Sequence, residues 1–190
     1  MVDGHGRGRP RSESARAAVL HAVDDLLVEV GYAELTMKGI AERAGVGRQT
    51  VYRWWSSKAE VLYEASVLDA RKELSVPRSD DPRKDVEAYL GALVAFLARS
   101  HAGAAYRALM GEAQHDPDVA ALLASRDILG ESAADVVDAA RAACGTALSS
   151  EQATALLIGP AFFHVLSGRD VDGIDTTALA EQFMRVLEAP

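Results

Sequence analysis

One stretch of the chain decides the fold, residues 36–62, which read TMKGIAERAGVGRQTVYRWWSSKAEVL. Thr36 can cap a short helix, and Gly45 can end it by taking a positive φ where the chain reverses. A further short helix is expected over residues 46–55. Two short helices joined by a tight turn that contains glycine form a helix-turn-helix pattern. Its small shared core is expected to comprise Ile40, Ala41, Ala44, Val46, Val51 and Trp55.

The second helix of this pattern is expected to expose a row of polar side chains that suits the major groove of DNA. Arginine can bind guanine through two hydrogen bonds, glutamine can bind adenine, and threonine can contact the methyl group of thymine. A recognition helix places its first residues on base edges, so Arg48 and Gln49 are the first candidates for reading bases. The whole row comprises Arg48, Gln49, Thr50, Tyr52 and Arg53.

Residues 36–62 closely resemble the DNA-binding domain of TetR-family transcriptional regulators. With the helix expected before them, the resemblance covers about a third of the chain. It implies that Thr36, Tyr52 and Lys58 contact phosphates while the recognition helix reads bases. Physical chemistry agrees for Lys58, because it would lie in the first turn of a helix, whose amides also attract phosphate.

Four positions depart from the common family pattern. Gly47 stands where serine is common, Gln49 where glycine is common, and Trp54-Trp55 where histidine and phenylalanine are common. Trp55 is expected to replace the buried phenylalanine, and Gln49 adds a potential base reader. Similar helix pairs occur in purely structural bundles, but the polar row, Lys58 and the family spacing favour DNA binding.

The net charge of −8 over 190 residues argues, as an average, against a nucleic-acid partner. The distribution of charged residues along the chain changes that conclusion. Up to Lys58, nine basic and seven acidic residues give +2, whereas the remaining eleven basic and twenty-one acidic residues give −10. This asymmetry indicates a mildly basic working surface joined to an acidic body.

The first eleven residues are rich in glycine, arginine and proline and lack apolar periodicity, so residues 1–11 are expected to form a disordered arm. Within them, Arg7-Gly8-Arg9-Pro10-Arg11 resembles the core of an AT-hook, in which arginines beside glycine lie along a narrow minor groove. Arg7 and Arg9 are therefore further candidates for DNA binding. A solvated tail without a binding role is the alternative interpretation.

The whole chain is expected to be all-α with about nine helices, because it is rich in alanine and lacks alternating β-branched strands. An apolar stripe predicts a first helix over about residues 12–30, with Gly31 just beyond its end. Further helix starts are indicated at Ser57 with Glu60, Asp81-Pro82, Asp116-Pro117, Ser149 with Gln152, and Asp175 or Thr176. The helix that opens at Ser57 should run to about residue 76.

These signals divide the chain into the arm (1–11), a three-helix DNA-binding domain (12–57) and a larger helical domain (58–190). In TetR-like proteins the larger domain binds a small ligand and forms the dimer. Its candidate ligand-binding residues combine apolar bulk with a few polar tips, as small-molecule sites do. They are Tyr89, Leu93, Phe96, His101, Tyr106, Met110, His115 and Phe163, each of which could instead be an ordinary core residue.

Residues 156–166 are apolar on almost every face, so the helix they form should be buried on every face. Packing against a second subunit, together with the last helix, would achieve this, and a central helix of a monomer is the alternative. The candidate dimer residues are Leu156, Gly159, Phe162, Phe163, Leu166, Phe183 and Leu187.

No cofactor or metal site is expected, because His101, His115 and His164 lack a close His or Glu partner at helical spacing and the chain has one cysteine. A buried, inert thiol is favoured over a redox sensor for Cys144. The first residues lack the apolar segment of a secretory signal, and no apolar run approaches the roughly 18 residues that span a bilayer. A cytoplasmic protein that does not enter the membrane is therefore expected.

These observations together favour a homodimeric transcriptional regulator, most often a repressor in this family. It would bind a palindromic operator in double-stranded DNA and release it when a small molecule binds. The sequence contains no phosphate-binding loop or local nucleophile motif that would indicate an enzyme. The alternatives are a small-molecule-binding helical protein or enzyme without specific DNA binding, and an architectural DNA-binding protein without a ligand.

Overall fold

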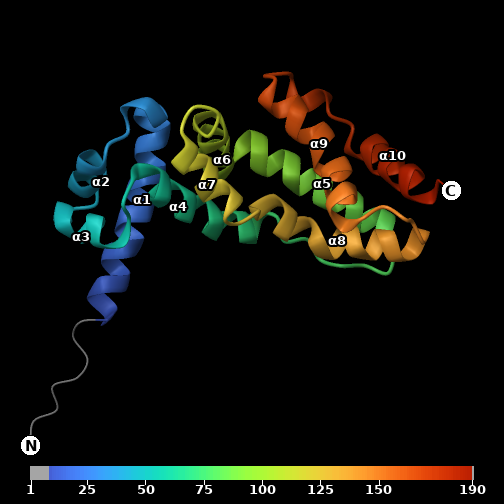
Figure 1. The fold of residues 1–190 in the computed structure, drawn as a ribbon, viewed down its shortest axis with the longest axis horizontal. Helices are drawn as coiled ribbons and strands as arrows, with labels where there is room; N and C mark the ends of the chain where they lie inside the picture. The colour runs from blue at the N-terminus through green and yellow to red at the C-terminus, as the bar shows by residue number, and fades with distance from the viewer. Residues whose placement is uncertain (1–8, 190) are drawn as a thin grey trace, which may run out of the picture.

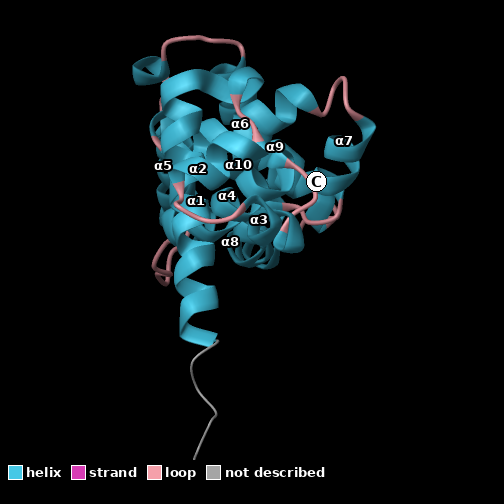
Figure 2. Cartoon of the chain, turned by 90° about the vertical axis from the view of Figure 1, so that its left-hand side faces the viewer, coloured by secondary structure: helices cyan, strands magenta, loops and turns pink. Residues whose placement is uncertain are grey.

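The computed structural model describes residues 9–189, and these residues form helices and loops with no strand (Figures 1 and 2). The expected all-α class is confirmed. The helices are α1 (Arg9–Glu34), α2 (Met37–Arg43), α3 (Arg48–Trp54), α4 (Lys58–Glu73), α5 (Pro82–Arg99), α6 (His101–Glu112), α7 (Pro117–Ala124), α8 (Ile128–Cys144), α9 (Ser150–Leu166) and α10 (Thr176–Glu188), with a 3-10 turn at Val171–Gly173. None of the described helices is long and apolar enough to cross a membrane.

Helices α1, α2 and α3 form a head at one end of the molecule, and α5 to α10 form a body at the other (Figure 1). Helix α4 joins them, because it packs against α1 on the head side and against α6 on the body side. Helix α5 lies at the centre of the body, in contact with α6, α8, α9 and α10. This central position explains why its largest side chains are fully buried.

Helix α1 begins at Arg9, three residues before the expected start near residue 12, and the predicted arm over residues 1–11 stays a prediction. Pro10 fits the first turn because amides there have no partner within the helix. Gly31 has a φ of 76° and interrupts α1 where the sequence predicted its end. Arg7 and the side chain of Arg9 lie outside the described part, so their predicted role in DNA binding stays a prediction.

The predicted helix caps are confirmed at most positions. Asp81 and Asp116 each cap a helix that starts with proline, and Asp175, rather than Thr176, caps α10. Ser149 and Gln152 form the reciprocal capping box at the start of α9.

The capping box predicted at Ser57 is only half formed. Its hydroxyl accepts a hydrogen bond from the Glu60 amide at 3.2 Å. The carboxylate of Glu60 does not return to the amide of Ser57 but accepts from the amide and the hydroxyl of Ser56, both at 2.6 Å. Hydrogen bonds of Glu60 to two consecutive serines, Ser56 and Ser57, therefore fix the turn between α3 and α4.

Cys144, at the end of α8, is half-buried and unpaired. Burial is the main cause that raises the pKa of its thiol, with the carboxylate of Glu188 as a smaller contribution. A raised pKa keeps the sulfur protonated at neutral pH and lowers its reactivity. The interpretation as an inert thiol is therefore favoured.

Candidate nucleic-acid interface and ligand cavity

The turn between α2 and α3 has the geometry of a helix-turn-helix. Thr36 is extended, with its hydroxyl accepting from the Gly39 amide at 3.0 Å, and this bond fixes the start of α2. Gly45 takes a φ of 66° in the turn, a backbone conformation that favours glycine. Ile40, Ala41, Val51 and Trp55 are buried, and Ala44 and Val46 are half-buried against them, as expected for the shared core.

The outer face of α3 presents polar side chains to the surroundings. Arg48, Gln49, Tyr52 and Arg53 are exposed, whereas Thr50 is half-buried. Val51 on the opposite face is fully buried and anchors the helix to the head. The guanidinium of Arg48 and the side-chain amide of Gln49 therefore project from the first turn of a helix that packs firmly against the head.

Trp55 fixes the end of α3 to α1 and α4. Its indole Nε1 donates to the Glu64 carboxylate at 2.9 Å, and the same carboxylate accepts two hydrogen bonds from Arg16, at 2.8 and 2.6 Å. The Arg16 guanidinium also lies 5.5 Å from the centroid of the Trp55 ring. Because Trp55 is only 3% exposed, Glu64 supplies the acceptor that its buried indole needs.

Lys58, the expected phosphate ligand, is bound within the head. Its ammonium donates to the Tyr32 carbonyl at 2.7 Å and to the Ala33 carbonyl at 3.4 Å. It also lies 4.3 Å from the centre of the Tyr32 ring. An ammonium group has three donors, so these contacts leave a direction open for a further acceptor.

Tyr63, the residue before Glu64, connects α4 to the body. The Tyr63 hydroxyl donates to the carbonyl oxygen of Arg126 at 3.0 Å. Arg126 precedes Asp127, whose carboxylate caps α8 by accepting from the Gly130 amide at 2.9 Å. Adjacent residues of α4 therefore hold the head on one side and the start of α8 on the other.

Asp24 lies on α1, and its side chain is half-buried. Burial, and to a lesser extent the nearby carboxylate of Asp69 on α4, raise the pKa of Asp24 to about 6. The imidazoles of His21 and His101 act in the opposite direction. The carboxyl group of Asp24 therefore binds its proton more tightly in the folded protein than in the unfolded chain.

We expect Asp24→Asn to stabilise the protein at neutral pH. As the pH rises from about 4 to above 6, ionisation of Asp24 costs folding free energy, because its pKa is higher in the folded state. With an allowance for its partial exposure, the variant should gain about 1 kcal/mol near pH 7.5 and about nothing near pH 4. Urea unfolding at both values measures this. Glu34→Gln, at an exposed position near the end of α1, is the control, and an equal gain for Asp24→Asn at both pH values would contradict the explanation.

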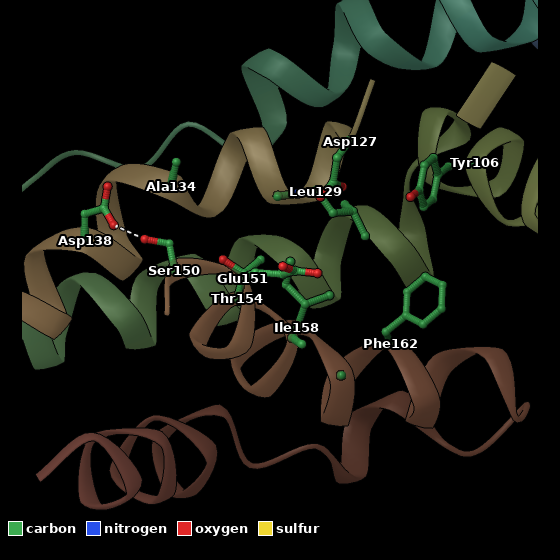
Figure 3. A pocket seen from close by; sticks show the side chains of 13 residues that line it. Tyr106, Asp127, Leu129, Ala134, Asp138, Ser150, Glu151, Thr154, Ile158 and Phe162 are labelled. Atoms are coloured by element: carbon green, nitrogen blue, oxygen red, sulfur yellow. Dashed lines mark hydrogen bonds between the residues drawn. The ribbon is translucent and has the colours of Figure 1, made fainter. Parts of the chain in front are cut away.

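A cavity of about 560 Å³ in the body lies between α8 and α9, with α6 at one end (Figure 3). Tyr106 is the one predicted ligand-binding residue that lines it. The lining residues are Tyr106, Asp127, Leu129, Gly130, Ala134, Asp138, Ser150, Glu151, Thr154, Ala155, Ile158, Gly159 and Phe162. Gly159 and Phe162, predicted for the dimer interface, also border the cavity, and their role in an interface stays a prediction.

The other predicted ligand-binding residues lie elsewhere. Tyr89, Leu93 and Phe96 are buried in the core around α5, where the Tyr89 hydroxyl donates to the Leu129 carbonyl. His101 and His115 are exposed, Met110 is half-buried, and Phe163 points away from the cavity lining. Large side chains, which the predicted ligand-binding residues share, do not mark this cavity. The sequence signal for it is the small residues that line it, Ala134 on α8 and Ala155 and Gly159 on α9.

One face of α9 and α10 exposes large apolar side chains. Leu156, Phe163 and Leu166 on α9 are 44%, 61% and 43% exposed, and Val186 on α10 is 46% exposed. A shallow groove between the two helices is lined by Leu156, Pro160, Leu179 and Val186, among others. Phe183 and Leu187, also predicted for the interface, are buried, and Phe183 lines the same groove, so their place in an interface stays a prediction.

Comparisons with known proteins agree with this architecture. Residues 19–65 match the family model of bacterial regulatory proteins of the tetR family, and residues 76–187 match that of the tetracyclin repressor-like C-terminal domain. The HTH-type transcriptional regulator YdeS of Bacillus subtilis is 39% identical over 114 residues, which cover 60% of this chain and 57% of YdeS. The HTH-type transcriptional regulator Mb1581 of Mycobacterium bovis is 32% identical over 108 residues, 57% of this chain and 50% of Mb1581.

The matched segments thus span only 50–57% of the length of these curated relatives. A solved structure extends the comparison to nearly the whole chain. The crystal structure of the TetR family transcription regulator SCO0332 is 26% identical and covers 92% of this chain and 97% of its own, with a TM-score of 0.69. Since the C-terminal model alone matches more than half of the residues, the chain belongs to the TetR family of bacterial regulatory proteins.

Proposed function

We propose that the protein is a homodimeric, ligand-responsive transcriptional repressor that acts on DNA in the cytoplasm. The observation that carries this proposal is the exposed polar face of α3 on a rigid head. In the proposal, Arg48 and Gln49 read base edges, with Thr50 and Arg53 beside them, while Thr36, Tyr52 and Lys58 bind phosphates. The head would comprise residues 12–57, and the ligand-binding and dimerisation domain residues 58–190.

The exposed apolar face of α9 and α10 supports the dimer. Monomeric proteins rarely leave such large side chains together in water, and a second copy would cover them. A two-fold axis would then set the two heads about 34–36 Å apart, the repeat of successive major grooves. Such a dimer would recognise a palindromic operator.

Helix α4 is the proposed lever between ligand and DNA. A ligand in the cavity would contact the start of α8, which Tyr63 ties to α4 through the Arg126 carbonyl. Glu64, the next residue, holds Trp55 and Arg16 in the head. A shift of α4 would change the separation of the two heads, and DNA affinity would fall because one separation fits successive grooves and another does not.

Selection of bound duplexes from a random DNA library tests this function. The full chain should enrich one palindromic sequence. A protein that only binds or converts a small molecule would enrich none, and an architectural DNA-binding protein would enrich fragments without a shared sequence. Either of those two results would refute the proposed repressor.

Arg48→Ala should weaken binding to the selected operator by about 1–3 kcal/mol and relax the preference at one base pair per half-site. The reason is that a guanidinium that binds guanine discriminates among bases. Fluorescence anisotropy with the operator and with single-base variants measures both effects. Arg71→Ala, which removes the same charge from an exposed position on α4, should leave the preference unchanged. Uniform weakening on all sequences would make Arg48 a phosphate ligand instead.

A further inference from the structure

The cavity between α8 and α9 has two chemically different ends (Figure 3). Tyr106 and Phe162 lie at one end, together with the Asp127 carboxylate that caps α8, and Asp138, Ser150 and Glu151 lie at the other. We propose that the cavity takes an amphipathic organic cation, with its apolar body between the helices and its charged nitrogen at the acidic end. This inference deepens the proposed function, since that cation would be the effector.

The middle of the cavity suits an apolar body. Leu129 and Ala134 from α8 and Ile158 from α9 contribute aliphatic surface, and Phe162 adds an aromatic ring. A volume of about 560 Å³ falls within the range of small-molecule sites. Burial of a hydrocarbon chain in such a space is favourable by about 25 cal/mol per Å² of apolar surface.

Charge at the cavity favours a cation. Three carboxylates, those of Asp127, Asp138 and Glu151, line it, and the lining includes no lysine, arginine or histidine. The first two carboxylates are already bound: Asp127 caps α8, and Asp138 accepts from Ser150 at 2.8 Å and forms a salt bridge at 3.3 Å with Arg141, which also donates to Ser150 at 2.8 Å. Glu151 alone therefore supplies the uncompensated negative charge at this end. Glu151 is exposed in the first turn of α9 and is the carboxylate best placed to pair with a ligand.

The hydroxyl of Tyr106 is a second, independent sign of a ligand. Tyr106 is only 8% exposed, and its hydroxyl points into the cavity without a hydrogen-bond partner among the described residues. Burial raises the pKa of Tyr106 to about 12, so the group remains a proton donor at neutral pH. Because this hydroxyl is accessible from the cavity, a ligand with an acceptor at its apolar end would accept a hydrogen bond from it.

Calorimetric titration of the full chain, without DNA, with three probes of one shape tests the charge. The probes are phenylhexylamine, phenylhexanol and phenylhexanoate, which are a cation, a neutral molecule and an anion near pH 7.5. We expect the amine to bind about tenfold more tightly than the alcohol, and the carboxylate to bind most weakly. Equal affinities, a preference for the carboxylate, or no binding of the amine at millimolar concentration would overturn the proposal.

Glu151→Gln tests the assigned carboxylate. It should lower the affinity for the amine to nearly that for the alcohol and leave the alcohol unchanged. Glu181→Gln is the matched control, because it removes the same charge from an exposed position on α10 outside the cavity. If both variants weakened amine binding equally, the attraction would come from the acidic body as a whole, and the assigned site would be wrong.

Tyr106→Phe tests the aromatic end. An amine of the same length with an acetyl group on its ring should bind the natural protein several-fold more tightly than phenylhexylamine. Tyr106→Phe should abolish this gain without changing phenylhexylamine binding, and a gain that persists in the variant would contradict the role of the hydroxyl. All these titrations omit DNA, so their failure is distinct from failure to select an operator.

Discussion

Leu156→Asp should convert the protein to a monomer and lower its affinity for the selected operator by about 100-fold or more. In the proposed dimer this side chain lies on the face shared by α9 and α10, where a partner would cover it. A carboxylate there loses its hydration without gaining a partner, which costs several kcal/mol. A single head can bind only one half-site, so the second set of phosphate and base contacts is lost.

Leu68→Asp is the matched control for this change. Leu68 on α4 is 47% exposed and Leu156 is 44% exposed, so the two substitutions are alike in residue type and in starting exposure. Sedimentation velocity should show a monomer for Leu156→Asp and a dimer for Leu68→Asp. Circular dichroism should show the same helix content in both. A dimeric Leu156→Asp protein would refute the assignment of this face.

Most helix starts could be predicted from the sequence because the interactions that fix them are local. Thr36, Asp81, Asp116 and Ser149 each accept from an amide two or three residues ahead. Such a bond depends little on the remainder of the chain. Gly45 is similar, since its positive φ follows from the turn itself.

The faces of the body helices could not be predicted in the same way. The apolar stripe of α10 indicated a buried face but not what would bury it, and Phe183 and Leu187 pack inside their own chain. Tyr89 and Phe96 were candidates for a pocket because they are large, but α5 lies between four other helices and they fill the core. Long-range packing decides both outcomes.

Gly103→Ala should destabilise the protein by about 2–4 kcal/mol. A methyl group at Gly103 would lie 1.8 Å from the carbonyl oxygen of Phe96 and 2.6 Å from its carbonyl carbon. Both atoms belong to the backbone of α5, so relief requires the two helices to move apart. The Gly103 amide also donates to the Ser100 hydroxyl at 2.9 Å, the cap of α6, which such a movement would strain.

Gly111→Ala on the same helix is the control, because nothing lies within 4 Å of its added carbon. Removing a glycine from an exposed helical position should stabilise the protein by about 0.5–1 kcal/mol. Urea unfolding should therefore move the two variants in opposite directions. Equal stability of Gly103→Ala and the natural protein would show that α5 and α6 can separate without cost. Because Gly103 lies one turn before Tyr106, the same displacement should move the Tyr106 hydroxyl and remove the affinity gain of the acetyl-bearing amine.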